Sequence, residues 1–263
     1  SVRYGRRSIR KTMGMNLVVD VGNSRGKAAL FGEGGIVKRW TFGGTGTEEF
    51  DAIFCRYGRV ARAVLSSTRG EDAALEALLR ERSDYFLKFT NATPIPLQNA
   101  YATPQTLGSD RLAAAVGARE LFPERNLLVV DFGTAVTCDI VTAGGCYLGG
   151  SISPGLSMRL RALADYTGRL PLLSAGECVA VCPDAGVPSS TATAMAAGTI
   201  EGIELEVRGR MERYAGEFAG LVTIFTGGDA PLFEKRFKNT IFANCELVLT
   251  GLNTLLDYNA DRK

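Results

Sequence analysis

The sequence NLVVDVGNS at residues 16–24 returns in altered form as NLLVVDFGT at residues 126–134, and this repetition decides the fold. Each copy is an apolar run that ends in Asp, a variable residue, Gly and a small polar residue. A second β-prone run follows each copy, at residues 27–31 and 136–141. Short apolar runs bounded by turn residues are typical of buried strands. The two stretches therefore predict a duplicated β-hairpin, and with it two related halves of one chain.

The turn in each hairpin has the properties of a phosphate-binding turn. Gly22 and Gly133 permit a tight bend, and no bulky side chain covers the backbone N–H groups around them. Exposed N–H groups in such a turn donate hydrogen bonds to phosphate oxygens. An Asp-x-Gly turn is also a common structural turn, so one copy alone is weak evidence for a phosphate-binding site. Two equivalent copies, followed by TGGD at residues 226–229 after an apolar run, are much more specific.

Helical and strand patterns surround the hairpins. The spacing of apolar residues predicts helices over residues 71–82, 109–122 and 190–217. Ser109 is suited to cap the second of these helices, and Asp110 lies in its first turn. Further strands are predicted at residues 36–42, 60–66, 221–226 and 247–250. Strand-rich openings followed by helices, occurring twice, predict an α/β chain of two related lobes with mixed sheets flanked by helices.

The boundary between the lobes is expected near residues 122–126, where a helix meets Pro123. This gives an N-terminal lobe at residues 15–124 and a C-terminal lobe at residues 125–263. Residues 1–14 hold five basic residues and no acid, and they lack the apolar region of a secretory signal. We interpret them as a disordered leader or an expression remnant, or as the product of an upstream start codon, with a targeting segment as the alternative.

Composition narrows the chemistry, because the 263 residues include no histidine. This excludes catalytic triads that use histidine, histidine-ligated zinc and imidazole as a general base, so carboxylates are the best candidates for proton transfer. Six scattered cysteines without a Cys-x-x-Cys pair fit a reducing compartment. Residues 15–263 carry 25 basic and 28 acidic residues, and no run reaches the ~18 apolar residues of a membrane helix. We expect a cytoplasmic protein that binds neither nucleic acid nor membrane.

Two common nucleotide-binding motifs are missing: residues 22–28 have the wrong spacing for a Walker A motif, and no Gly-x-Gly-x-x-Gly follows a strand. Two hairpin turns with a late Gly-Gly instead resemble the actin, Hsp70 and sugar-kinase superfamily. Within it, the chain is similar to type III pantothenate kinases from Met15 nearly to the C-terminus. The resemblance rests on the order and spacing of DVGNS-x-x-K (20–27), Y-x-x-P-x-x-x-GSDR (101–111), DFGTAVTCD (131–139), GGSISPG (149–155), LP (170–171), T-x-x-AM-x-x-G (191–198), TGGD (226–229) and LVLTGL (247–252).

The resemblance implies ribonuclease H-like (actin-like ATPase) lobes and the ATP-dependent phosphorylation of pantothenate to 4′-phosphopantothenate, the first step of coenzyme A biosynthesis. It implies that Asp110 is the catalytic base. The chemistry agrees, because a carboxylate in a first helical turn is stabilised as an anion and can accept a hydroxyl proton. From the residues alone, Asp110 could also be a polar residue at the helix start without a catalytic role.

The resemblance also implies a pantothenate site. Its residues are Tyr101, Gly108, Ser109, Asp110, Arg111 and Thr191. Pantothenate is a small carboxylate with a primary alcohol, so a pair of Arg111 for the carboxylate and Asp110 for the hydroxyl is chemically complete. A surface salt bridge is the alternative for Arg111.

The resemblance assigns the ATP phosphates to the first hairpin turn and to one residue of the second lobe. These residues are Asp20, Val21, Gly22, Asn23, Ser24, Arg25, Gly26, Lys27 and Thr134. Asp20 would hold Mg²⁺ through water, because Mg²⁺ in proteins usually keeps several waters. Lys27 would neutralise phosphate charge, unless it only opens an edge strand. Asp131 resembles the position that binds a monovalent cation, potassium or ammonium, in this family.

Two positions depart from the family pattern: Ser109 stands where Ala is usual, and Ser24 where Thr is usual. Both are small, and Ser24 keeps the hydroxyl. The resemblance further implies a homodimer, and twofold dimers are the commonest oligomers. Two other functions stay open. One is another small-molecule kinase or an ATPase of the same fold, which residues 108–111 with Tyr101 and Thr191 argue against. The other is a nucleotide-binding accessory protein of transcription.

Overall fold

The computed structural model describes residues 14–23, 25–43, 47–183, 186–237 and 241–262, and the chain divides into two compact units. Unit 1 comprises Ser1–Pro123 and Glu246–Lys263, and unit 2 comprises Glu124–Cys245. The predicted leader lies outside the described residues except for Gly14. The units divide within the expected boundary region, but the last 18 or so residues cluster with unit 1 and not with an uninterrupted C-terminal lobe at 125–263.

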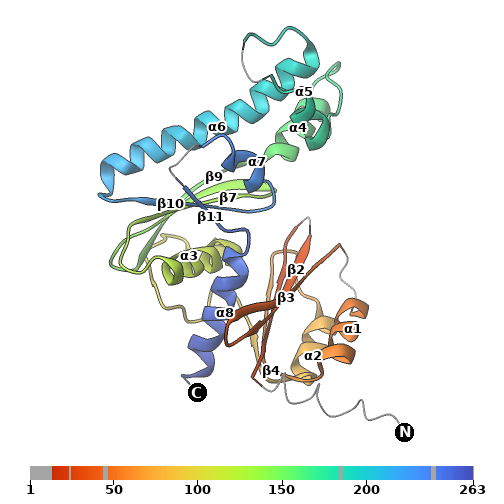
Figure 1. The fold of residues 1–263 in the computed structure, drawn as a ribbon, viewed down its shortest axis with the longest axis vertical. Helices are drawn as coiled ribbons and strands as arrows, with labels where there is room; N and C mark the ends of the chain where they lie inside the picture. The colour runs from red at the N-terminus through yellow and green to blue at the C-terminus, as the bar shows by residue number, and fades with distance from the viewer. Residues whose placement is uncertain (1–13, 24, 44–46, 184–185, 238–240, 263) are drawn as a thin grey trace. The chain divides into compact units, whose positions relative to one another are not determined.

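Unit 1 is built on a mixed sheet (Figure 1). The strands of this sheet are β1 (Asn16–Val21), β2 (Gly26–Gly32), β3 (Gly35–Phe42), β4 (Val60–Ser67) and β5 (Ser83–Lys88), and the short β6 (Gln98–Asn99) is not one of them. Its helices are α1 (Glu48–Tyr57), α2 (Ala73–Glu81), α3 (Ser109–Leu121) and α8 (Leu247–Ala260), with a 3-10 turn at Pro104–Thr106. The strand order is β3-β2-β1-β4-β5. β1 pairs antiparallel with β2, β2 antiparallel with β3, and β4 parallel with both β1 and β5.

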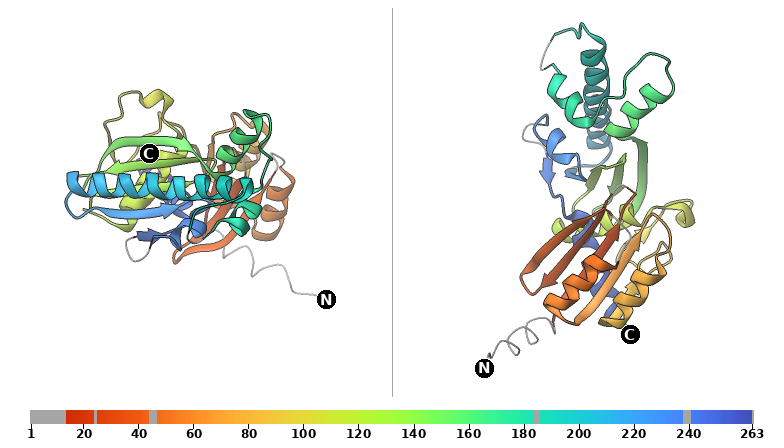
Figure 2. Two further views of the ribbon diagram at one scale, coloured as in Figure 1. Left: turned by 90° about the horizontal axis from the view of Figure 1, so that it is seen from above. Right: turned by 90° about the vertical axis from the view of Figure 1, so that its right-hand side faces the viewer.

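Both faces of this sheet are covered, which explains why β1 reads as a continuous apolar run. Successive strand residues point to opposite faces. Leu17, Val19 and Val21 pack with residues of α1 and α2, and Figure 2 (right) shows these helices together on one face of the sheet. Val18, fully buried as well, belongs to the opposite face, where α8 contacts β1 and β4.

Unit 2 repeats this arrangement. Its strands are β7 (Leu127–Phe132), β8 (Ala135–Val141), β9 (Cys146–Pro154), β10 (Val222–Thr226) and β11 (Ile241–Ala243). Its helices are α4 (Leu156–Asp165), α5 (Ala175–Val181), α6 (Thr191–Glu217) and α7 (Ala230–Glu234). Within the unit the strands run in the order β9-β8-β7-β10-β11. β8 pairs antiparallel with β7 and β9, whereas β10 pairs parallel with β7 and β11.

The two sheets therefore share one topology. Three consecutive antiparallel strands form a meander, and its first strand also pairs with the first of two further parallel strands. This confirms the predicted class of two related ribonuclease H-like lobes with mixed sheets flanked by helices. In unit 2 the long helix α6 covers one face of the sheet (Figure 1), and its Ala196, Ile200 and Ile203 join a core with Leu128 and Val130 of β7. None of the helices among the described residues has the length and apolarity needed to cross a membrane.

Most predicted elements are confirmed within one or two residues. The helix predicted at 71–82 is α2, which Asp72 caps through its side chain, and the helix at 190–217 is α6, capped by Ser190. The cap of α3 is different from the one expected. Gly108, with extended backbone angles, is the N-cap, and Ser109 is already the first helical residue. Asp110 still lies in the first turn, as predicted.

The strand predicted at residues 247–250 is wrong, because these residues begin helix α8. Periodicity cannot separate a short, wholly apolar strand from a buried helix segment. Residues 247–250 are too short a segment to show the polar stripe at helical spacing, Thr250, Asn253, Thr254 and Asp257, that α8 carries further along. α8 packs against α3 as well as against the sheet. The helices touch closely at two glycines: a Cβ on Gly251 would overlap the Ala113 carbonyl oxygen, and one on Gly117 would overlap the Leu247 carbonyl oxygen.

Candidate functional site

The first predicted turn lies at the end of β1 in unit 1. Asp20 and Val21 are the last residues of β1, and β2 begins at Gly26. The Gly22 N–H donates to the Arg25 carbonyl at 3.2 Å, which closes the turn. Lys27 pairs with Asp20 across the two strands, so an ammonium and a carboxylate occupy opposed positions at the base of the turn. Ser24, predicted to contact phosphate, lies outside the described residues.

The segment just after β4, the strand that lies beside β1, holds this turn from the side. The Thr68 N–H, just after β4, donates to the Val21 carbonyl at 3.0 Å. The Arg69 Nε–H donates to the Asn23 carbonyl, also at 3.0 Å. These bonds tie the Val21 and Asn23 carbonyls of the turn to the segment after β4.

Among the carboxyl groups of this region, Asp20 has the most strongly shifted pKa. Its Oδ1 is fully buried and has no hydrogen-bond partner among the described residues. The pKa of Asp20 is raised from 3.8 to about 6, first by burial and then by the charge of Asp110, while a hydrogen bond from Ser66 and the charge of Lys27 lower it. A buried carboxylate oxygen without a partner, close to a second carboxylate, suits a hard cation such as Mg²⁺.

The second carboxylate belongs to the start of α3. Asp110 Oδ1 accepts the Arg111 backbone N–H at 2.9 Å, inside the first helical turn. Gly108 leaves the space that this side chain needs, because a Cβ at residue 108 would lie 2.5 Å from Asp110 Oδ1. The positive end of the helix dipole favours the ionised form of a carboxylate in this position. The GSDR motif therefore begins with glycine for a steric reason, because any larger residue would crowd the Asp110 side chain.

Arg111 is buried, with 7% of its surface exposed, so it is not a side chain of the open surface. Its guanidinium carbon lies 5.5 Å from the centre of the Tyr101 ring. Tyr101 is held in turn by its backbone N–H, which donates to Asn99 Oδ1 at 3.0 Å. A cation over an aromatic face is an attractive pair, and more so when it is removed from water. The structure thus brings together Tyr101 and Arg111, two residues of the predicted pantothenate site.

The sequence analysis missed Ser66, which connects these two regions. It is fully buried near the end of β4 and pairs with Asp20 in the β1–β4 register. Its hydroxyl bonds to the Asp20 carboxyl group and lies 3.2 Å from Ser109 Oγ. A serine that closes a strand gives no signal by itself, and only the strand register reveals it. Asp20, Ser66, Ser109 and Asp110 form what we call the unit 1 carboxylate cluster.

The second predicted turn, in unit 2, is one residue shorter than the first. Asp131 lies at the end of β7, and the Gly133 N–H donates to the Ala135 carbonyl at 3.1 Å. Thr134 stands at the tip, where its carbonyl accepts the Gly155 N–H at 3.0 Å. A Cβ on Gly155 would overlap the Gly133 carbonyl oxygen. The GGSISPG motif therefore ends in a glycine because its backbone packs directly on this turn.

Gly227 of the TGGD motif approaches the same turn. Its φ of +97° lies in the region that favours glycine. A Cβ at this residue would overlap both Asp131 Oδ1 and the Phe132 carbonyl oxygen. The Asp229 N–H donates to that Phe132 carbonyl at 3.0 Å. The missing side chain thus lets this backbone pack directly against two oxygens, a carboxylate and a carbonyl.

Thr191 is the first residue of α6 and is exposed. The helix start is fixed by reciprocal hydrogen bonds between Ser190 and Thr193, so the Thr191 side chain is not needed as a cap. A polar side chain exposed beside a rigid helix start is available to bind a ligand.

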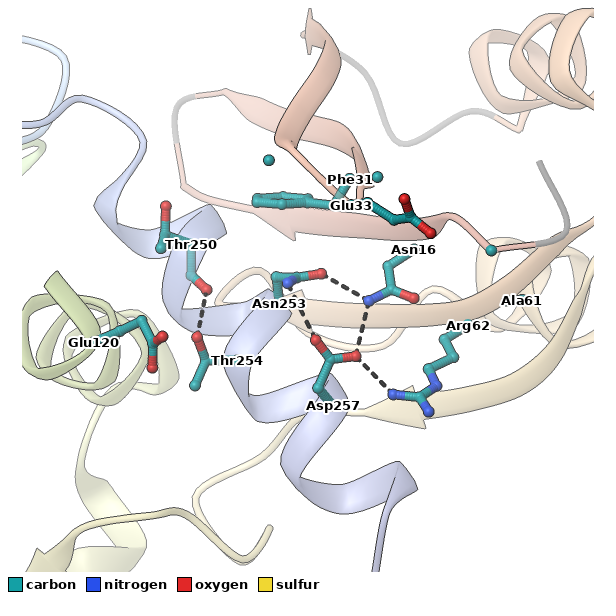
Figure 3. Close-up of a pocket in the computed structure, with 13 residues that line it drawn as sticks. Asn16, Phe31, Glu33, Ala61, Arg62, Glu120, Thr250, Asn253, Thr254 and Asp257 are labelled. Carbon is teal, nitrogen blue, oxygen red and sulfur yellow. Dashed lines mark hydrogen bonds and ion pairs between the residues drawn. The ribbon is translucent and has the colours of Figure 1, made fainter. Parts of the chain in front are cut away.

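A cavity of about 680 Å³ in unit 1 lies elsewhere (Figure 3). No predicted site residue lines it. Asn16, at the start of β1, donates to Asn253 and to Asp257 at 2.9 Å each, and Arg62 donates to Asp257 at 2.7 Å. The polar groups of this cavity are largely satisfied by one another. They attach α8 to β1 and β4 at the end of β1 remote from Asp20.

Comparisons with known sequences agree on one family. The family model described as type III pantothenate kinase matches residues 16–213. A type III pantothenate kinase of Bacteroides fragilis is 39% identical over 248 residues, which cover 94% of this chain and 100% of the relative. A type III pantothenate kinase of Azobacteroides pseudotrichonymphae is 43% identical over 244 residues, which cover 93% of this chain and 97% of the relative.

Solved structures agree on the fold. A Campylobacter jejuni protein, described as a candidate transcriptional activator of the Baf family, matches with a TM-score of 0.57 and 22% identity, over 93% of this chain and 99% of that chain. A glucokinase from an Antarctic psychrotroph matches with a TM-score of 0.52 and 12% identity, over 94% and 100%. At these identities the likeness shows a shared fold, that of sugar-kinase ATPases.

Proposed function

The chain belongs to the type III pantothenate kinase family, and on that premise we propose how its residues carry out ATP-dependent phosphorylation of pantothenate, the step that opens coenzyme A biosynthesis. The observation that carries the proposal is the unit 1 carboxylate cluster. Phosphoryl transfer needs the donor phosphates to be held and neutralised, and the acceptor hydroxyl to be oriented in line. The cluster has one carboxylate for each task, Asp20 at the phosphate turn and Asp110 at the GSDR motif.

Asp110 is the proposed catalytic base. It accepts the proton of the primary hydroxyl of pantothenate as the hydroxyl oxygen attacks the γ-phosphorus of ATP, and the bond from that phosphorus to the β–γ bridging oxygen breaks to release ADP. Its place in the first turn of α3 supports this role, because the N-terminal end of a helix attracts negative charge. A well-placed base contributes about 10²–10⁴-fold to the rate.

Arg111 and Tyr101 are proposed to hold the other end of pantothenate. A guanidinium forms two parallel hydrogen bonds with a carboxylate, and Arg111 stacks over Tyr101, which restricts its orientation. Gly108 and Ser109 would contact the substrate at the start of α3, and Thr191 would contribute a hydroxyl from α6.

The turn from Val21 to Lys27 is proposed to hold the ATP phosphates. Backbone N–H groups of the turn donate to phosphate oxygens, and Lys27 neutralises charge beside Asp20. Asp20 Oδ1 is buried and has no hydrogen-bond partner within the described part of the chain, which supports a role in holding Mg²⁺ through water. When bound, Mg²⁺ would supply positive charge that offsets the negative charge developing on the phosphates.

Two residues of unit 2 have proposed roles with ions and phosphates. Thr134, at the tip of the second turn, donates its hydroxyl and N–H to the phosphates. Asp131 binds a monovalent cation, potassium or ammonium. The neighbourhood of Gly227 supports this, because the Asp131 carboxylate oxygen and the Phe132 carbonyl oxygen both lie beside it, and oxygen donors suit such cations.

We further propose a cytoplasmic homodimer. Unit 2 exposes large apolar side chains on α4, α5, α6 and the segment after α4, and large exposed apolar patches on soluble proteins often mark interfaces. These side chains are Met158, Tyr166, Leu172, Val179 and Leu205, of which Tyr166 is 88% and Leu205 67% exposed. Light scattering at micromolar concentration tests the oligomeric state.

The direct test of the function is ADP release by the purified chain with ATP, Mg²⁺ and potassium, with and without pantothenate. We expect release to require pantothenate, to stop without Mg²⁺ and to fall when sodium replaces potassium. Mass spectrometry of the product should show 4′-phosphopantothenate. Turnover that another small alcohol supports better would indicate a different kinase of this fold. ATP binding without turnover would indicate an accessory protein, a role for which the Campylobacter likeness gives no argument beyond the fold.

A further inference from the structure

Ser66 joins the two halves of the unit 1 carboxylate cluster through its hydroxyl. The residue is 0% exposed and stands one residue before the end of β4. It bonds to the Asp20 carboxyl group on one side and lies 3.2 Å from Ser109 Oγ on the other. A fully buried hydroxyl is costly unless it is hydrogen-bonded. Its two partners here belong to the phosphate turn and to the acceptor motif.

The direction of this short chain of hydrogen bonds follows from the number of protons. An ionised carboxylate only accepts, and a serine hydroxyl has a single proton to donate. Ser66 therefore donates to Asp20, and Ser109 donates to Ser66. Hydrogen bonds in such a chain polarise one another, and the bond to a charged carboxylate is the strongest of them.

This chain of bonds counteracts a repulsion. The charge of Asp110 disfavours ionised Asp20, so the two carboxylates, left to themselves, would be driven apart. Ser109 directly precedes Asp110 in the first turn of α3, so a bond that holds Ser109 also holds the backbone that carries Asp110. In-line transfer is sensitive to such placement, since an error of about 1 Å can cost about 10²-fold in rate.

We propose that Ser66 and Ser109 are positioning residues that hold the Asp20 carboxylate and the first turn of α3 at the separation phosphoryl transfer requires. The inference rests on the proposed function and adds two residues to it. Neither hydroxyl reacts. Their effect is on alignment, and it should appear in kcat more than in the binding of either substrate.

The neighbouring Ser67 provides a matched control. It ends the same strand, but its hydroxyl donates to the Gly70 carbonyl at 2.8 Å in an exposed loop and contacts no carboxylate of the cluster. Ser66→Ala and Ser67→Ala thus remove the same atom from adjacent residues. Only the first change breaks the connection between Asp20 and Ser109.

The experiment measures kcat, both KM values, ADP affinity by calorimetry and the thermal midpoint for the wild type, Ser66→Ala, Ser67→Ala, Ser109→Ala and Ser66→Thr at pH 8. In Ser66→Ala we expect kcat to fall about 10- to 10²-fold, the loss expected for one hydrogen bond to a charged group. KM for pantothenate and ADP affinity should stay within about threefold. Ser67→Ala should match the wild type, and Ser66→Thr, which keeps a hydroxyl, should recover most of kcat.

The double variant Ser66→Ala/Ser109→Ala separates a connected pair from two independent effects. If the hydroxyls act as one unit, the double variant loses little more than Ser66→Ala alone, because the effects are not additive. Ser109→Ala lies at the edge of the cluster and removes one weak bond, so it keeps the test usable if Ser66→Ala folds poorly. It should lower kcat in the same direction by a smaller factor.

Three results would overturn the inference while leaving the proposed function intact: an active wild type with Ser66→Ala within about twofold of its kcat, additive losses in the double variant, or a loss that Ser66→Thr does not recover. A wild type that releases no ADP with pantothenate overturns the proposed function and the inference together. The wild-type assay therefore distinguishes the two failures.

Discussion

Asp20 and Asp110 lie close enough in unit 1 for the charge of Asp110 to raise the pKa of Asp20. The two carboxylates come from the end of β1 and the first turn of α3, which are 90 residues apart in the chain. Two acidic groups kept together in a partly buried place destabilise the folded protein at neutral pH. Proteins hold such arrangements at functional sites, where a bound cation removes the repulsion.

The first prediction concerns stability and pH in the absence of metal and nucleotide. The pKa of Asp20 is about 6 in the folded chain, against 3.8 ordinarily, so the folded state binds this proton more tightly than the unfolded state does. Ionised Asp20 therefore costs stability above pH 6, and the cost disappears as the pH falls from about 6 to about 4. At pH 7.5, Asp20→Asn should be more stable than the wild type by about 2–3 kcal/mol.

Urea unfolding at several pH values measures this difference. Glu33→Gln is the control, because Glu33 is an exposed acid of the same unit and should show no such trend. A difference between Asp20→Asn and the wild type that stays constant from pH 4 to pH 8 would contradict the assignment of the raised pKa to Asp20.

The second prediction concerns the space beside Asp110. Gly108→Ala places a Cβ 2.5 Å from Asp110 Oδ1, so the carboxylate has to turn away. We expect kcat to fall at least about 10-fold, with a cost in stability of only about 1 kcal/mol for the changed helix cap. Steady-state kinetics beside thermal unfolding separates these effects. Gly176→Ala, at the start of α5 with open space around it, should leave kcat unchanged.

Much of the fold could be predicted from the sequence, because strands and turns of the hairpins are local patterns. The apolar runs around Asp20 and Asp131, the glycine turns after them and the capped helix α6 all carry their own signals. The two sheets with identical topology follow from the duplication. Packing between distant segments carries no such signal, which is why residues 247–250 were predicted as a strand and why α8 was assigned to the second lobe.

The same division holds for the candidate site. Asp20, Gly108 and Asp110 were found because they belong to short motifs with a chemical reason. Ser66 was not found, since its importance comes from its register opposite Asp20 and from its distance to Ser109. The glycines Gly155 and Gly227 were noted only as motif members. Glycine is needed at these two positions because backbones approach each other closely at the second turn, and only the three-dimensional structure reveals this.

The third prediction tests the placement of α8. Gly251→Ala puts a methyl group onto the Ala113 carbonyl oxygen, and α3 and α8 have to separate. We expect destabilisation by about 2–3 kcal/mol or loss of folding, as for other overpacked interiors. Gly209→Ala, in the middle of α6 with no neighbour near its Cβ, should instead stabilise by about 0.5–1 kcal/mol. Equal effects of the two substitutions on urea unfolding would argue against the α3–α8 contact.

The fourth prediction concerns the second turn. Gly227→Ala introduces a Cβ where Asp131 Oδ1 and the Phe132 carbonyl oxygen lie, at a backbone φ of +97°. Strain of about 1–2 kcal/mol is expected from the backbone alone. If these two oxygens bind a monovalent cation, the potassium concentration for half-maximal activity should rise about 10-fold or more. Gly216→Ala in α6, which has open space, is the control. An unchanged potassium dependence in a folded Gly227→Ala protein would remove the support for a cation at Asp131.

The central claim is that Asp110 accepts the proton of the acceptor hydroxyl, and one kinetic comparison tests it most directly. The measurement is pantothenate-dependent ADP release by Asp110→Asn beside the wild type and Glu120→Gln, an exposed acid on the last turn of the same helix. The account predicts that kcat falls about 10²–10⁴-fold in Asp110→Asn while ATP binding persists, and that Glu120→Gln stays at the wild-type rate. A kcat for Asp110→Asn within about threefold of the wild type would contradict it.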